Sequence, residues 1–164
     1  MALATLPRRR QSLPAATGLL VLSCWPDIDY LPGVLLGDLN RFHQGLTHSL
    51  AFVLLGATLA YPLLHRAFHG KSRSTPLRLW AILLTVALSH LLFDIFTQDF
   101  RPPIGLPLFW PFSDLPIHSP FTLFPAWAKS TLAEALHSPQ NLHALLIESL
   151  YALPLAFIPS FLRR

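Results

Sequence analysis

Long apolar tracts that carry almost no charge constrain the fold of this chain more than any other feature of its sequence. Four of them stand out in the 164 residues, at 11–26, 44–64, 79–98 and 142–162. Each approaches the roughly 20 residues that a helix needs to cross the hydrocarbon layer of a membrane. Charged residues make up only 12% of the chain, against about 25% in soluble domains. We therefore expect a single all-α membrane domain over residues 1–164, built as a bundle of about four membrane helices.

Prolines and a glycine interrupt the first and last tracts. The breaks are at Pro14, Gly18 and Pro26 in the first tract and at Pro154 and Pro159 in the last. Freed backbone groups at membrane depth need protein or water partners. The first tract is therefore expected to span only together with Tyr30–Leu36, or to dip into the membrane and return. A secretory signal peptide is a competing interpretation, because three arginines at 8–10 precede a short apolar stretch.

The connection between the third and fourth tracts is rich in proline and aromatic residues. Residues 102–127 include the run Leu108-Phe109-Trp110-Pro111-Phe112. Tryptophan favours the headgroup level of a membrane, and this many prolines prevent a continuous helix. We expect an interfacial loop here, followed by a short surface helix at 131–137.

The basic residues predict how the chain is oriented. They gather at 8–10, 66–78 and 163–164, and short basic loops lie on the cytoplasmic side of bacterial membranes. With four crossings, all three clusters fall inside, so both termini are expected in the cytoplasm. The connections at 27–43 and 99–141 then lie outside, together with most of the candidate functional side chains.

The charge balance and the cysteine content exclude several classes of function. The net charge of +4 comes from the clusters that set topology, so no nucleic-acid partner is expected. Cys24 is the single cysteine, which rules out an intramolecular disulfide framework and a cysteine-based zinc cluster. The chain has no Gly-x-Ser-x-Gly nucleophile motif. A metal site would have to use histidine and carboxylate ligands.

A histidine and an aspartate lie four residues apart within the third tract. His90 and Asp94 are the two ionisable residues at 79–98, and a helix places them on one face, one turn apart. Ionisable side chains at membrane depth are costly and mark functional sites. We interpret them as metal ligands, with a purely structural hydrogen-bonded pair as the alternative.

Two further segments carry the same residue types. Pro26-Asp27-Ile28-Asp29 sets two carboxylates two residues apart, where both can approach one cation or divide between two; a capping or turn role is the alternative. His43 and His48 lie five apart and would point about 140° apart on a straight helix. Joint ligation therefore needs a break, which Gly45 supplies.

The residue before His48 suggests where the second membrane helix begins. Thr47 is expected to be the N-cap, with His48 in the first turn. Such a helix N-terminus would favour an anionic group such as phosphate. The alternative is an interfacial histidine pair without a ligand.

Other ionisable residues are weaker candidates. His118 and Asp114 lie in the proline-rich loop, and His143 and Glu148 lie in the fourth tract, where burial would raise the pKa of Glu148 and suit a general base. His65 and His69 are expected to be solvated in the basic inner loop.

These motifs occur in an order that resembles a known family. The elements are Pro26-Asp27-Ile28-Asp29, His43-x-Gly45-x-Thr47-His48-Ser49, Ser89-His90-x3-Asp94 and Leu108-Phe109-Trp110-Pro111-Phe112. Together they resemble the bacterial family of predicted inner-membrane-bound metal-dependent hydrolases over roughly residues 15–115. That family's pattern is distantly similar to the zinc-dependent phospholipase C and P1 nuclease group. The resemblance implies a multi-pass protein of the bacterial inner (plasma) membrane that uses a divalent metal for hydrolysis.

One position departs from that family's pattern. The family usually has arginine after the first histidine of the second element, and this chain has Gln44. An arginine there would give an anionic substrate group a charge-assisted, bidentate contact. Arg41 lies three residues earlier and is a candidate substitute.

Two functions of different class follow. The first is a membrane hydrolase in which Asp27, Asp29, His43, His48, His90 and Asp94 bind one or two divalent ions, with Asp27, Asp29 and His48 as catalytic residues. Mixed carboxylate and imidazole ligands suit zinc, manganese or ferrous iron, and zinc is preferred. The substrate would be a phosphoester or a lipid-linked molecule at the outer face. The second is a non-catalytic metal-binding or transport protein, which should place polar groups at mid-bilayer on several helices.

Overall fold

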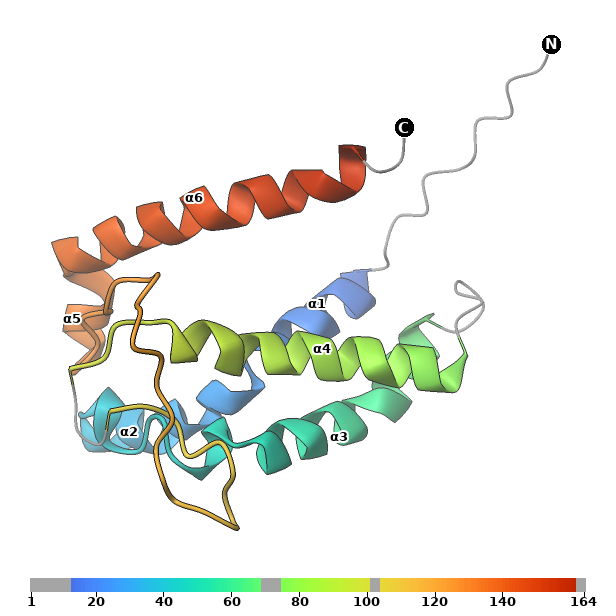
Figure 1. The fold of residues 1–164 in the computed structure, drawn as a ribbon, viewed down its shortest axis with the longest axis horizontal. Coiled ribbons are helices and arrows are strands. Elements are labelled where there is room, and N and C mark those ends of the chain that lie inside the picture. Colours follow the sequence, from blue (N-terminus) through green and yellow to red (C-terminus); the bar gives the residue numbers. More distant parts are fainter. Residues whose placement is uncertain (1–12, 69–74, 101–103, 162–164) are drawn as a thin grey trace.

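The described part of the chain is entirely helical apart from loops. The computed structural model describes residues 13–68, 75–100 and 104–161 (Figure 1). Its helices are α1 (Leu13–Ser23), η1 (Trp25–Asp29), α2 (Tyr30–Leu36), η2 (Leu39–Arg41), η3 (Leu46–His48), α3 (Leu50–Phe68), α4 (Pro76–Ile95), α5 (Leu132–His137) and α6 (Pro139–Phe161). Within those ranges β-pairing is limited to two isolated bridges. The prediction of an all-α protein is confirmed at this level.

The described helices supply fewer membrane spans than predicted. By length and composition α4 can cross a membrane, and Ala16–Ser23 with Trp25–Leu36 passes the same test as a pair bent by 63°. Leu50–Arg66 is a shorter apolar helix. One or two candidate spans are therefore found among the described residues, so the four-span bundle is not confirmed. A pair bent in this way forms either a broken span or a re-entrant loop, the two arrangements predicted for the first tract.

The last tract is less interrupted than its sequence suggests. The prediction that Pro154 and Pro159 break it was wrong, because α6 runs as one helix from Pro139 to Phe161. A proline removes one backbone hydrogen bond and bends a helix without having to end it. The short helix expected at 131–137 is present as α5, and Thr131 caps it by accepting a hydrogen bond from the Glu134 amide.

The core lies between α1, α3 and α4, which contact one another. Leu79, Leu83, Ala87 and Leu91 of α4 recur every four residues and are buried, as one face of a helix requires. Leucines on other faces of the helices remain exposed, including Leu54, Leu59, Leu63, Leu77 and Leu92. A helix that is apolar on all sides is typical of a membrane environment.

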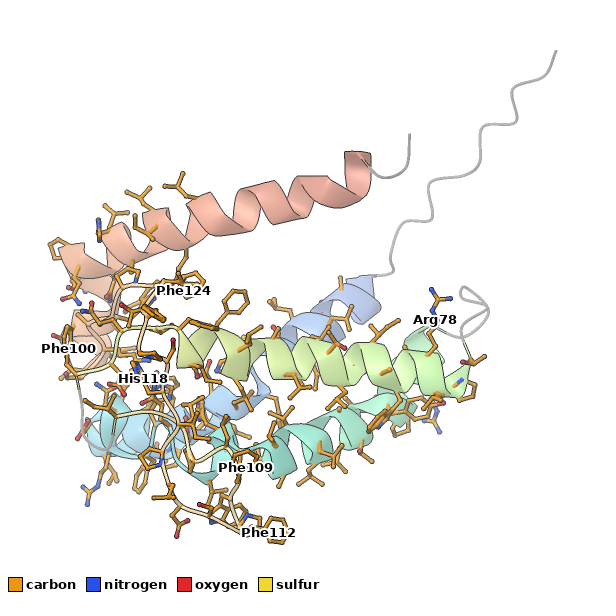
Figure 2. The ribbon with its side chains drawn as sticks, viewed as in Figure 1. Arg78, Phe100, Phe109, Phe112, His118 and Phe124 are labelled. Atoms are coloured by element: carbon orange, nitrogen blue, oxygen red, sulfur yellow. The ribbon has the colours of Figure 1, made fainter. Side chains whose placement is uncertain are left out.

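The proline-rich loop closes one end of this core. The Leu50 amide of α3 donates to the Leu108 carbonyl of the loop (2.9 Å), and the Ser119 amide of the loop donates to the carbonyl of Ile95 at the end of α4 (3.1 Å). Figure 2 shows Phe112 at the loop tip, directed away from the helices, and its side chain is 94% exposed. Arg78 lies at the opposite end of α4. The described part of the loop, from residue 104 on, is therefore hydrogen-bonded to the end of the bundle that carries His90 and Asp94.

Candidate metal centre

The structure brings all six predicted ligands into one cluster. Asp27 and Asp29 come from η1, His43 and His48 from the segment before α3, and His90 and Asp94 from the last turns of α4. Their ligand atoms form two groups, one of Asp27, Asp29, His43 and His48 and one of His48, His90 and Asp94, with all atoms of a group within 4.8 Å of one another. The cluster can bind a metal ion; the role of each residue stays a prediction.

The chain breaks before α3, as the histidine spacing requires. Gln44 adopts a left-handed conformation (φ 61°) and Gly45 is extended, so the two histidine rings meet at right angles with centroids 4.8 Å apart. The prediction of Thr47 as the cap was wrong. Gly45 is the residue that precedes the short helix η3. α3 begins at Leu50, and the Ser49 hydroxyl before it accepts a hydrogen bond from the Phe52 amide.

The Thr47 hydroxyl has a different partner. It donates a 2.6 Å hydrogen bond to Asp29 Oδ2. The Asp29 carboxylate is buried, so hydrogen bonds from protein groups replace those that water would make. Because α3 begins at Leu50, its first turn does not include His48.

Four atoms of the cluster lie near one another, and three of them, from His48, His90 and Asp94, are spaced as the ligands of one metal ion. Asp94 Oδ2 lies 3.3 Å from His48 Nε2 and 3.4 Å from His90 Nε2. Asp27 Oδ1 lies 3.8 Å from His48 Nε2 and 3.5 Å from His90 Nε2. A tetrahedral zinc ion with bonds of about 2.0–2.1 Å separates its ligand atoms by about 3.3 Å. The spacing therefore fits one divalent ion.

Three of these atoms lack hydrogen bonds. His48 Nε2, His90 Nε2 and Asp94 Oδ2 are buried and make no hydrogen bond within the part of the chain that the structure describes. Leaving a buried polar atom unsatisfied costs about 1–3 kcal/mol. A bound cation would satisfy all three at once, so the donor set fits a metal.

Asp29 has a different environment from Asp27. Its carboxylate accepts from Thr47 and lies 3.0 Å from His48 Nδ1 and 3.3 Å from His43 Nδ1, and its side chain is 6% exposed. Histidine ligands commonly donate their second ring N–H to such a carboxylate, which fixes the tautomer and the ring. Asp29 thus orients the His48 ring so that Nε2 faces Asp94. The Asp27 side chain, by contrast with that of Asp29, is 32% exposed.

The protonation of the two histidines before α3 differs. Burial lowers the pKa of the His48 imidazole, but the neighbouring carboxylates of Asp29 and Asp94 outweigh it, and the net shift is upward. Burial is the main cause that holds the pKa of His43 below its ordinary value, and the charge of Lys129 acts in the same direction. In the metal-free protein a proton therefore occupies His48 more readily than His43.

A cavity of about 740 Å³ opens beside the cluster. Its lining includes the ligand side chains of Asp27, His90 and Asp94, together with Phe93 and Phe124. Cavities of about 300–1,000 Å³ are typical of small-molecule sites. The cluster is therefore open to a ligand from one side.

Sequence reasoning missed Lys129. Its ammonium lies 2.9 Å from His43 Nε2 and 5.2 Å from the centre of the Tyr30 ring, and it lines the cavity. Burial lowers the pKa of this ammonium, while the charges of Asp94 and Asp27 oppose that shift. No motif marks this lysine, because 86 residues separate it from His43.

The weaker candidates lie outside the cluster. His118, labelled in Figure 2, has its Nε2 atom 3.4 Å from the Thr97 carbonyl, and Asp114 is exposed. His143 is exposed on α6, and Glu148 accepts a 2.6 Å hydrogen bond from the Trp127 indole at the cavity wall. His65 contacts the Tyr61 ring on α3. His69 and the three basic clusters at the termini and around 69–74 fall largely or wholly outside the described residues.

The fold and the cluster define a helical protein with many exposed apolar side chains and a largely buried group of histidines and aspartates. The chain belongs to the YdjM inner membrane protein family, whose model matches residues 1–163. Comparison with curated proteins and with solved structures returned no match. Membership of this family assigns the chain to the inner membrane.

Proposed function

We propose that this protein is an inner-membrane hydrolase that uses one divalent metal ion, preferably zinc, to cleave a phosphoester. The observation that carries the proposal is the set of three buried, unsatisfied atoms of His48, His90 and Asp94 beside a cavity. Catalytic zinc sites typically have three protein ligands and one open position, whereas structural sites are closed. The corner next to Asp27, on the cavity side, is the proposed open position.

A single ion is favoured over two. The second group of candidate ligands, around Asp29 and His43, is already satisfied by hydrogen bonds among its own members and Thr47. Asp29 is therefore proposed to position His48, and His43 to extend that network. Manganese and ferrous iron are alternatives to zinc with the same ligand types.

The side chains then divide the work of hydrolysis. When bound, the ion supplies a Lewis acid that lowers the pKa of water and polarises a phosphoryl oxygen. Asp27 is proposed to accept a proton from the attacking water. The water oxygen bonds to phosphorus as the ester bond breaks, and Asp27 then passes the proton to the departing ester oxygen. Asp29 keeps the His48 ring in one tautomer. Substrate would enter through the cavity, at the outer face predicted from the basic clusters.

Elemental analysis of the detergent-purified protein tests the metal site. We expect close to one zinc, manganese or iron per chain, lost in the double variant His90→Ala, Asp94→Ala, because two of three proposed ligands are removed. The matched control is Asp114→Ala, His118→Ala, which removes the same residue types at the same spacing outside the cluster and should keep the metal. Absence of metal from the wild type, even after reconstitution with divalent ions, refutes the mechanism; two ions per chain refutes the single-ion site.

A further inference from the structure

Lys129 is held in place with hydrogen-bonding capacity to spare. His43 Nδ1 faces Asp29 at 3.3 Å, so His43 Nε2 is the ring atom that accepts from the Lys129 ammonium at 2.9 Å. The ring of Tyr30 lies beneath the same ammonium. An ammonium carries three N–H donors, and His43 is its one hydrogen-bond acceptor within the described residues. The remaining donors are available to a ligand.

This ammonium lies where two cavities meet. Besides the cavity of about 740 Å³ there is a second of about 730 Å³, and His43, Asp94, Thr97, Trp127 and Lys129 line both. The proposed ligand Asp94 and the positive charge of Lys129 thus belong to the shared wall. A group bound beside this wall would lie next to residues of the metal centre and next to the ammonium.

The two cavities differ in the chemistry of their other walls. Apolar atoms supply most of the exposed surface of the first, with Leu39, Phe93, Phe124 and Ala135 on its walls. Outside the shared wall, its charged or imidazole groups are the cluster residues Asp27 and His90 and the Trp127-bound Glu148. The second is lined mainly by polar and charged residues, among them Asn40, Arg41, Gln44, Gln98 and Ser130. An apolar chain is favoured in the first and a hydrated headgroup in the second.

We propose that Lys129 binds the anionic phosphoester of an amphiphilic substrate, whose apolar chain occupies the first cavity and whose polar headgroup occupies the second. This inference rests on the proposed hydrolase function and adds the substrate class. Gln44 stands where the resembled family usually has an arginine, and its uncharged amide cannot give an anion a charge-assisted contact. Lys129 supplies such a contact from a different part of the chain. Arg41 lines the headgroup cavity without lining the apolar one.

Titration calorimetry with n-decylphosphonate tests this proposal, because the carbon–phosphorus bond of this probe resists hydrolysis. The metal-loaded protein in lipid nanodiscs should bind the probe, and Lys129→Met should weaken binding by about tenfold or more, as loss of a charge-assisted hydrogen bond implies. Lys129→Arg keeps the charge and should restore binding to within a few-fold of wild type. Metal content, measured on the same samples, should be unchanged in both variants.

A second comparison separates the amphiphile from free phosphate. Phe124→Ala should weaken n-decylphosphonate binding and leave methylphosphonate and inorganic phosphate unaffected, because only the decyl chain reaches the apolar wall. Wild-type affinity for inorganic phosphate equal to that for n-decylphosphonate overturns the amphiphile assignment.

The remaining outcomes distinguish this proposal from the metal site. Equal probe affinity in wild type and Lys129→Met, with metal retained, overturns the role of Lys129 and leaves the metal site standing. Loss of metal in Lys129→Met assigns the lysine to supporting His43 and the centre, which also overturns the anion role. A wild type that holds neither metal nor probe overturns both proposals.

Discussion

At the scale of single residues, the buried carboxylate of Asp29 organises the cluster. It accepts from Thr47 and faces the Nδ1 atoms of both His43 and His48. The opposite ring atom of His48 is left pointing at Asp94 and Asp27. Sequence spacing treats Asp27 and Asp29 as equivalent, but burial and hydrogen bonding make one a positioning residue and leave the other facing the cavity.

Asp29→Asn should weaken metal binding by about 10- to 100-fold without abolishing it, the usual effect of losing a partner of a histidine ligand. The amide keeps the shape of the side chain but offers one acceptor oxygen and no charge to His48. Competition with a chromophoric chelator measures the change. Asp114→Asn, an exposed loop carboxylate, should bind metal as the wild type does. An Asp29→Asn variant that loses metal as completely as His90→Ala, Asp94→Ala would instead make Asp29 a direct ligand.

At the scale of elements, η1 is held against α3 by close packing at a glycine. The Trp25 ring stacks on Phe52 with centroids 5.3 Å apart, and its indole donates to the Phe52 carbonyl. A Cβ at Gly56 would lie 2.4 Å from the Trp25 ring. Since Trp25 begins the short helix that carries Asp27 and Asp29, this contact sets the position of both carboxylates.

Gly56→Ala should therefore lower the thermal midpoint of unfolding and reduce metal occupancy, although alanine is the better helix former by about 1 kcal/mol. The reason is steric, because the ring has to move and carries η1 with it. Thermal unfolding in detergent and elemental analysis measure the two effects. Leu59→Ala, on an exposed face of α3, is the control and should retain the metal. A more stable Gly56→Ala with full occupancy would show that the packing tolerates a methyl group.

At the scale of the whole molecule, the two ends of α4 differ in chemistry. Arg78, labelled in Figure 2, lies at its first turn. His90 and Asp94 lie in its last turns, where the proline-rich loop is hydrogen-bonded to Ile95 through the Ser119 amide. Because α4 is long enough to cross a membrane, these ends are expected on opposite sides. The positive-inside rule then predicts that the arginine end lies in the cytoplasm and the cluster outside.

Labelling of single cysteines tests this orientation. In a Cys24→Ser background, a membrane-impermeant thiol reagent added to intact cells should label Ser113→Cys in the loop and not Ser72→Cys in the basic segment. Permeabilised cells should label both, which controls for reactivity. Labelling of position 72 alone in intact cells would invert the topology and move the cluster to the cytoplasmic face.

The helical class and the residues that gather in the cluster could be predicted from the amino-acid sequence. Uncharged apolar tracts favour helices in lipid, because a helix satisfies the hydrogen bonds of its own backbone N–H and C=O groups. The four-residue spacing of His90 and Asp94 places both on one face of such a helix. These signals are local, so they can be read without knowing how the chain packs.

The different environments of the clustered residues are evident only from the folded chain. Thr47 was expected to cap a helix and instead donates to Asp29, 18 residues away in sequence. Lys129 reaches His43 from 86 residues away, and the number of membrane spans expected from composition is not matched by the described helices. Burial, hydrogen-bond partners and shared cavity walls arise between distant segments, and no local pattern of residues encodes them.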